Sequence, residues 1–248
     1  MSLPEILSLS ILIAVVAALY SSVGHGGASG YLAVMSFVLM DPSLMSTTAL
    51  ILNVLVAGIG AVQFNRAGHF SWKLAWPFVL LSIPFAFAGG LLKISALIYF
   101  LLLSAVLLFA AYRLIRGAVA TGDEPSVPPT APIALSAGGG IGLLSGIVGV
   151  GGGIFLSPLM ILMKWAATKQ TAAISAFFIV VNSIAGLGGR FVRGGLEVGN
   201  IWPFALAAAA GGLIGSYFGA GKFTSRALRQ LLGIVLLIAA LKLVITAF

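Results

Sequence analysis

Charged residues are scarce in this chain. Asp, Glu, Lys and Arg make up 7% of its 248 residues, whereas hydrophobic residues make up 60% and the mean hydropathy is +1.18. An ordinary soluble domain has about 25% charged residues, because its surface faces water. The composition therefore excludes an ordinary soluble fold of this size. A lipid-facing exterior removes the need for surface charge, so the sequence predicts an integral membrane protein.

Cysteine is absent and acidic residues are few. The lack of cysteine excludes disulfides and thiol chemistry. Cation carriers and proton pumps usually need buried carboxylates, and enzymes or metal sites usually need paired acids or several histidines. We therefore expect no enzyme, no metal and no cofactor, and an anion as the favoured solute. All five acidic residues border apolar runs or lie in loops: Glu5, Asp41, Asp123, Glu124 and Glu197.

Basic residues outnumber acidic ones by 13 to 5, which gives a net charge of +8. They occur in small groups between apolar runs, as the positive-inside rule of membrane proteins requires. No basic run with interleaved aromatic residues is present, so nucleic acid is not expected as a partner. The expected partners are the lipid bilayer and a small anion.

Long uncharged runs divide the chain. Six of them have the length of one membrane crossing, about 20 residues. Two are longer, residues 6–40 and 133–163, and each is interrupted by glycines, Val23–Gly30 in the first and Val148–Gly153 in the second. A polar, proline-rich stretch, residues 113–132, separates the two groups of runs and is typical of a loop. The N-terminus lacks the basic region of a signal peptide, so we expect the first run to remain in the protein.

The order of these features occurs twice. In each half a glycine-broken run and one further span are followed by Phe-x-Arg-x-Gly, at 64–68 and again at 191–195. A Trp-Pro-Phe span comes next, at 76–78 and at 202–204, and one last span ends each half. Shared composition alone would not reproduce this order, so we infer an internal duplication. The predicted units are a first transmembrane repeat, residues 1–116, a cytoplasmic linker, 117–131, and a second repeat, 132–248, in one membrane domain.

The distribution of basic residues favours a hairpin at each glycine break. If the long runs crossed once, seven basic residues would lie on one side and six on the other. If each run enters and returns, nine lie on one side and four on the other, which obeys the positive-inside rule. The predicted fold is therefore an all-α polytopic membrane protein of two inverted-topology repeats, each a Gly-broken helical hairpin plus three transmembrane helices. The sequence leaves open whether the hairpins are re-entrant or pairs of short spanning helices.

We expect a multi-pass protein of the plasma (inner) membrane with both termini outside. The four outer basic residues would be Lys93, Arg190, Arg193 and Lys242.

The glycine breaks are the candidate solute site. Glycine permits turns within a helical run, and the freed N–H groups need burial or a wet cavity and attract anions. The alternative is close helix packing through small residues. The candidate substrate-binding residues are Gly24, His25, Gly26, Gly27, Ser29, Gly149, Gly151, Gly152, Gly153, Asn53 and Asn182.

Other polar residues have two interpretations each. His25 either contacts an anion or proton, or hydrogen-bonds a carbonyl freed at the break. Asn53 and Asn182 either contact solute or join helices. Arg66, Arg190 and Arg193 either steer anions at the entrances, or lie at the interface as ordinary snorkelling side chains.

At the two glycine clusters the sequence resembles the TauE/SafE family of sulfite and organosulfonate exporters. Gly149–Pro158 is close to the family's Gly-x-Gly-Gly-Gly-φ-φ-x-x-Pro pattern, and Gly24–Gly30 is a looser version of it. The stretch Arg66–Trp72 resembles the family's basic, glycine-containing stretch before the third span. The resemblance implies export of small sulfur-containing anions such as sulfite or related sulfonates. Our interpretation of the residues adds alternating access around a mid-membrane site, where the N–H groups of Gly26, Gly27, Gly151 and Gly152 hold the sulfonate group, supported by Ser29 and His25. The alternatives are a transporter or channel for another small anion, and a membrane scaffold or partner subunit that transports nothing.

Overall fold

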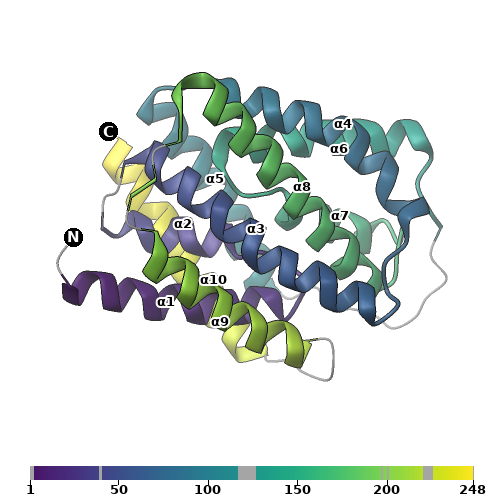
Figure 1. The fold of residues 1–248 in the computed structure, drawn as a ribbon, viewed down its shortest axis with the longest axis horizontal. Coiled ribbons are helices and arrows are strands. Elements are labelled where there is room, and N and C mark those ends of the chain that lie inside the picture. Colours follow the sequence, from purple (N-terminus) through teal and green to yellow (C-terminus); the bar gives the residue numbers. More distant parts are fainter. Residues whose placement is uncertain are drawn as a thin grey trace.

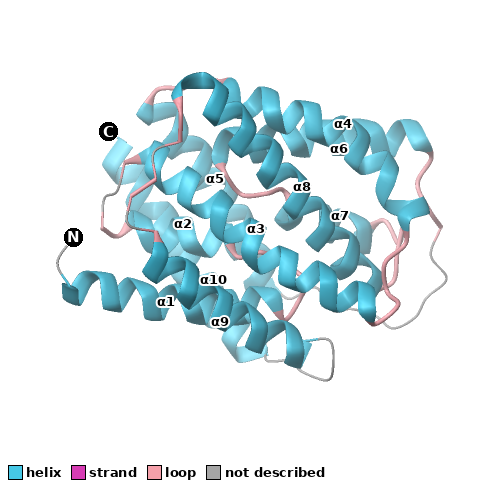
Figure 2. Cartoon of the chain, in the orientation of Figure 1, coloured by secondary structure: helices cyan, strands magenta, loops and turns pink. Residues whose placement is uncertain are grey.

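The structure, a computed structural model, describes residues 3–38, 41–116, 127–196, 198–199, 201–219 and 226–247. Across these ranges the chain forms ten α-helices and no β-strand, which confirms the all-α prediction (Figure 2). Five helices, α1, α3, α4, α6 and α8, are long and apolar enough to cross a membrane. The helices are α1 (Leu3–Ser21), α2 (Ala28–Ser36), α3 (Pro42–Arg66), α4 (Trp72–Leu91), α5 (Ala96–Arg116), α6 (Ala131–Val148), α7 (Gly153–Leu162), α8 (Thr168–Gly194), α9 (Trp202–Gly219) and α10 (Arg226–Ala247).

Helix lengths repeat between the two halves. The first five helices have 19, 9, 25, 20 and 21 residues. The next five have 18, 10, 27, 18 and 22 residues. The packing between the halves is also reciprocal. The fourth helix of the first half, α4, lies against the first helix of the second half, α6, and the first helix of the first half, α1, lies against the fourth helix of the second half, α9. In Figure 1 α3 and α8 cross the middle of the bundle between these two pairs.

The central helices α3 and α8 run in opposite directions. Phe64, near the end of α3, packs on Ala172, near the start of α8, whereas Leu50 lies beside Gly186 near the other end. Both chain termini lie at the same end of the bundle (Figure 1). We name this the terminus end. Antiparallel central helices are what two inverted halves require, and the orientation of each half relative to a bilayer stays a prediction.

The hairpins at the glycine breaks have unequal legs. α1 and α6 are long enough to span, whereas α2 and α7 have only 9 and 10 residues. At 1.5 Å per residue a helix of that length rises only about 14–15 Å, roughly half of a hydrocarbon core. Of the two alternatives that the sequence left open, these lengths do not fit pairs of short spanning helices and favour re-entrant hairpins.

Large apolar side chains remain exposed along the outer helices. Examples are Leu7 on α1, Leu80 on α4 and Leu206 on α9, each more than half exposed. An exposed apolar surface of this extent suits lipid and not water.

Polar side chains cap some of the helix ends. Asp41 accepts hydrogen bonds from the backbone N–H groups of Ser43 (2.7 Å) and Leu44 (3.2 Å) and so caps the start of α3.

Lys242, the one charge in the last apolar run, caps α2. Its Nζ donates to the carbonyls of Ser36 (3.0 Å) and Phe37 (3.1 Å), where α2 ends, and lies 5.2 Å from the centre of the Phe37 ring. Hydrogen bonds from a charged donor each contribute about 1.5–3 kcal/mol. We therefore expect Lys242→Met to lower the midpoint of thermal unfolding in detergent by several degrees. The control, Lys169→Met at the exposed start of α8, should leave it unchanged. Equal midpoints for the two variants would show that the cap does not stabilise α2.

Candidate anion-binding site

Both predicted glycine breaks are present. α1 ends at Ser21 and α2 begins at Ala28, and α6 ends at Val148 and α7 begins at Gly153. Ala28–Gly30, which the sequence grouped with the first break, form the first turn of α2. Matched glycines adopt left-handed backbone, Gly27 with φ +100° and Gly152 with φ +83°. This conformation is costly for other residues. All glycines of both breaks are buried, so the broken backbone lies within protein, as a membrane requires.

The two breaks meet at the centre of the bundle. A Cβ on Gly26 or on Gly151 would contact the same two side chains, Asn53 of α3 and Ile179 of α8. Asn53 and Ile179 lie near the middle of these antiparallel helices. Figure 2 shows the loop between α6 and α7 as a pink segment inside the bundle, behind α8. We name the region between the two breaks the central site.

Two short helices begin at the central site. Gly27 is the N-cap of α2 and Gly152 is the N-cap of α7. The start of a helix has unpaired N–H groups and the positive end of the helix dipole. Within the described residues, the backbone N–H groups of Gly26, Gly27, Gly151 and Gly152 donate to no other residue. Four unpaired N–H groups and two positive helix ends therefore lie in one buried region, and helix starts of this kind are common anion-binding places in proteins.

Asn53 connects the two breaks. Its Oδ1 accepts from the N–H of Ala28 (3.1 Å) and its Nδ2 donates to the carbonyl of Val150 (3.2 Å). The side chain is fully buried. Of the two interpretations, this geometry favours joining backbone segments over contact with solute. Asn182 differs, because its Nδ2 bonds the carbonyl of Phe178 on its own helix (2.9 Å), and its buried Oδ1 has no partner.

The central site also includes two hydroxyl groups that were not predicted from the sequence. Tyr31 Oη lies beside Gly27 and Ser183 Oγ lies beside Gly151. Both are buried and have no hydrogen-bond partner. Buried hydroxyl groups in proteins nearly always have one, so each is a donor available to a bound anion. The spacing of one helical turn between Gly27 and Tyr31 is the signal that would have identified the tyrosine.

Ser29 and His25 already have protein partners. The Ser29 hydroxyl lies 2.8 Å from Tyr20 Oη. His25 Nδ1 lies 3.1 Å from the carbonyl of Val23, which agrees with the interpretation that it bonds a carbonyl freed at the break. The other predicted glycines are packed closely: Gly24 against Ala172, Gly149 against Ser46 and Gly153 against Ile179.

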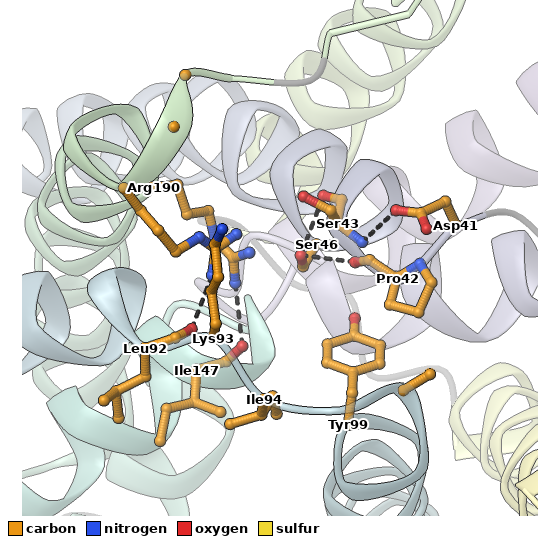
Figure 3. Close-up of a pocket in the computed structure, with 14 residues that line it drawn as sticks. Asp41, Pro42, Ser43, Ser46, Leu92, Lys93, Ile94, Tyr99, Ile147 and Arg190 are labelled. Carbon is orange, nitrogen blue, oxygen red and sulfur yellow. Dashed lines mark hydrogen bonds between the residues drawn. The ribbon is translucent and has the colours of Figure 1, made fainter.

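The three predicted arginines separate into two places. Arg190 and Arg193 line a cavity of about 400 Å³ at the terminus end, together with Lys93 and Tyr99. We name it the terminal cavity (Figure 3). Arg66, the last residue of α3, is exposed at the opposite end of the bundle. Arg193 is half-buried and its Nη1 donates to the carbonyl of Leu92 (2.7 Å).

Arg190 is buried and holds the end of α6. Its Nη2 donates to the carbonyls of Gly146 and Ile147, both at 3.0 Å. The hydroxyl of Tyr99 donates to the next carbonyl, Val148 (3.3 Å). These are the last carbonyls before the second break. Arg190 is only 4% exposed, so ordinary interfacial snorkelling does not describe it.

Known proteins are similar to this chain, one of them along nearly its full length. The sequence profile of the family described as sulfite exporter TauE/SafE matches residues 9–243. The chain belongs to the TauE/SafE family. A probable membrane transporter protein, y4hK, of Sinorhizobium fredii (strain NBRC 101917 / NGR234) is 36% identical over 243 residues, which cover 96% of this chain and 98% of that protein. Another, YunE of Bacillus subtilis (strain 168), is 29% identical over 107 residues, which cover 42% of this chain and 38% of that protein. No solved structure matches this chain.

Membership in TauE/SafE confirms the resemblance seen at the glycine clusters and makes the chain a multi-pass protein of a transporter family. The matched region includes both glycine breaks, Asn53 and all three arginines. In this TauE/SafE chain the structure brings the glycines and Asn53 together at the central site. It places Arg190 and Arg193 in a separate cavity and Arg66 at the far end of the bundle.

Proposed function

We propose that this TauE/SafE protein exports small anions, most specifically sulfite or organosulfonates, by alternating access around the central site. One observation carries the proposal: Gly26, Gly27, Gly151 and Gly152, whose N–H groups donate to no described residue, lie in the two neighbouring breaks where α2 and α7 begin. Each helix start is equivalent to about +0.5 charge. A sulfite or sulfonate group has three oxygens that accept hydrogen bonds, and the hydroxyls of Tyr31 and Ser183 add two donors to the four N–H groups.

The chemistry of the central site suits passage as well as binding. Its donors are backbone amides and hydroxyls without a full positive charge, so they bind an anion without trapping it. Asn53 links both breaks, so a movement of one half that opens one face is transmitted to the break of the other half. Antiparallel halves offer an anion two comparable routes, one toward each end of the bundle, as alternating access requires.

Membrane voltage supplies a driving force for export. No carboxylate occurs within the apolar runs, which disfavours a coupling-cation site. An inside-negative potential favours outward movement of an anion by about 2.3 kcal/mol per charge per 100 mV. Export therefore proceeds without a coupling ion.

Proteoliposomes loaded with radiolabelled sulfite test this function. At mildly alkaline pH, where the membrane-permeant neutral form is scarce, we expect an inside-negative potential to accelerate release several-fold over zero voltage. Protein-free liposomes serve as the control. Release that voltage does not change would contradict uncoupled export. A channel or carrier for a different anion would show release of sulfate or chloride in place of sulfite. Release of no anion above the control would leave the scaffold alternative.

A further inference from the structure

The terminal cavity has an excess of positive charge. Three cationic side chains, Lys93, Arg190 and Arg193, line it, against the single carboxylate of Asp41. That carboxylate already accepts two N–H groups at the start of α3, which neutralises part of its charge. Figure 3 shows the nitrogen atoms of Arg190 and Lys93 together on one side of the cavity, facing Ser43 and Ser46 on the other. Like charges repel, so such a cluster is most stable with an anion between its members.

Arg190 retains hydrogen-bond donors that the protein does not use. A guanidinium has five N–H donors, and Nη2 supplies the two that bind the carbonyls of Gly146 and Ile147. Nε is buried without a partner. Because a buried charged donor without a partner is costly, the free donors of Arg190 indicate a ligand in the terminal cavity.

The terminal cavity borders the central site without being part of it. Ser46 lines the cavity, and a Cβ on Gly149 would lie 2.8 Å from the Cβ of Ser46. Ile147, whose carbonyl Arg190 holds, also lines the cavity. The wall of the terminal cavity is therefore the start of the second glycine break.

Arg190, the buried member of the cluster, has no basic counterpart in the first half of the chain. Arg66 matches Arg193 in the repeat, so the position that matches Arg190, three residues earlier, is Gln63. An anion site built on Arg190 therefore belongs to the terminus end alone. A duplicated structural role, such as capping alone, would not explain this asymmetry.

We propose that the terminal cavity is a second anion-binding site, selective for oxyanions such as sulfate or a sulfonate, that holds the anion between the central site and bulk water. Arg190 anchors the anion, and Lys93 and Arg193 attract and contact it. The inference rests on the proposed function for the identity of the anion, but binding in the cavity does not depend on transport. With the termini outside, the terminal cavity is the exit through which an exported anion leaves.

The absence of cysteine allows a direct test. Ser43→Cys places one thiol on the cavity wall, and Thr168→Cys places one at the exposed start of α8, at the opposite end of the bundle. Both thiols lie in the first turn of a long helix, so the helix dipole affects them similarly. Thr168→Cys also carries Lys169→Gln, so that the adjacent basic residue does not attract the anionic reagent. Purified protein is reacted with an anionic, sulfonate-bearing methanethiosulfonate and with a cationic, trimethylammonium-bearing one. In each reaction the thiolate forms a mixed disulfide with the reagent's sulfenyl sulfur and releases methanesulfinate.

The proposal predicts that the ratio of anionic to cationic modification rates is about tenfold or more higher at Ser43→Cys than at Thr168→Cys. Adding Lys93→Gln and Arg193→Gln to Ser43→Cys should remove most of that difference. Sulfate and methanesulfonate should slow modification at position 43 and not at position 168. Sulfite is not used, because it cleaves mixed disulfides. Arg190 stays intact, because its substitution would also release the end of α6.

Three results would overturn the second site: equal rate ratios at the two positions, an unchanged ratio in the triple variant, or no protection by either anion. The transport assay separates this failure from that of the proposed function. If anions protect the thiol in the cavity but proteoliposomes release no anion, only the proposed export function is contradicted. If proteoliposomes release anion but the thiol at position 43 shows neither a preference for the anionic reagent nor protection by anions, only the second anion-binding site is contradicted.

Discussion

Gly152→Val should abolish anion release from proteoliposomes while the protein still inserts into the membrane. Two effects act together. The residue adopts φ +83°, a conformation that costs a non-glycine residue about 1–2 kcal/mol and a β-branched residue more. A Cβ would also lie 2.8 Å from both Ile141 and Phe178, and overpacking of this kind costs about 1–3 kcal/mol. The second break must shift, and its N–H groups then no longer point at the anion.

Gly140→Val is the matched control for this change. Gly140 lies on α6, in the same hairpin, and is exposed, and a Cβ added there would have no atom from the rest of the fold within 4 Å. This variant should release anion at the normal rate. Both variants should elute as monodisperse protein in size-exclusion chromatography. Normal release by a monodisperse Gly152→Val protein would remove the glycine breaks from the transport mechanism.

Asn53→Ala is expected to have a comparable effect for a different reason. The change leaves the N–H of Ala28 and the carbonyl of Val150 unpaired in the buried interior. Each unpaired group costs about 1–3 kcal/mol. The two breaks lose their common support, so we expect anion release to fall by at least about a hundredfold and the thermal midpoint to fall with it. Asn65→Ala, on the exposed last turn of the same helix, should change neither.

Asn53→Asp distinguishes the structural role of Asn53, which joins the two breaks, from the effect of a negative charge on anion binding. The carboxylate still accepts from Ala28, but it cannot donate to Val150, and it adds a negative charge beside the N–H groups of Gly26 and Gly151. Anion binding should therefore fall more than thermal stability does. An Asn53→Asp protein that binds anion as the wild type does would show that the central site is elsewhere.

Much of the fold could be predicted from local features of the sequence. Uncharged runs such as 74–92 have the length of one crossing. The glycines at 24–27 and 149–152 marked both breaks because each cluster lies inside a run too long for one crossing and the two recur in matching halves. A glycine cluster alone does not break a helix, since Gly138–Gly140 lie within α6. The duplicated Phe-x-Arg-x-Gly stretches indicated two matching halves. The length of α2 was not predictable, because residues 6–40 contain no charge to mark where the short helix ends. Residues 117–126 of the predicted linker, and residues 220–225 with Lys222, lie outside the described residues.

The partners of polar residues could not be predicted, because they come from distant parts of the chain. Asn53 bonds residues 25 and 97 positions away, and Arg190 bonds residues 44 and 43 positions away. From sequence alone Asn53 looked like one of several polar residues within a span. Arg190 was suspected because it lies where positive charge is disfavoured, but its contact with α6 depends on the packing of α8 against the other half. Lys93 was assigned only to topology, and the structure adds it to the terminal cavity.

The most direct test of the central site is to locate a bound anion by crystallography. Selenite resembles sulfite and scatters X-rays anomalously, so crystals grown with it locate the anion by its selenium. The account predicts a selenium peak in the central site, with oxygens about 2.7–3.2 Å from the backbone nitrogens of Gly27 and Gly152. Selenium found only in the terminal cavity, or at neither place while the protein transports selenite, would contradict the claim that the two glycine breaks hold the transported anion.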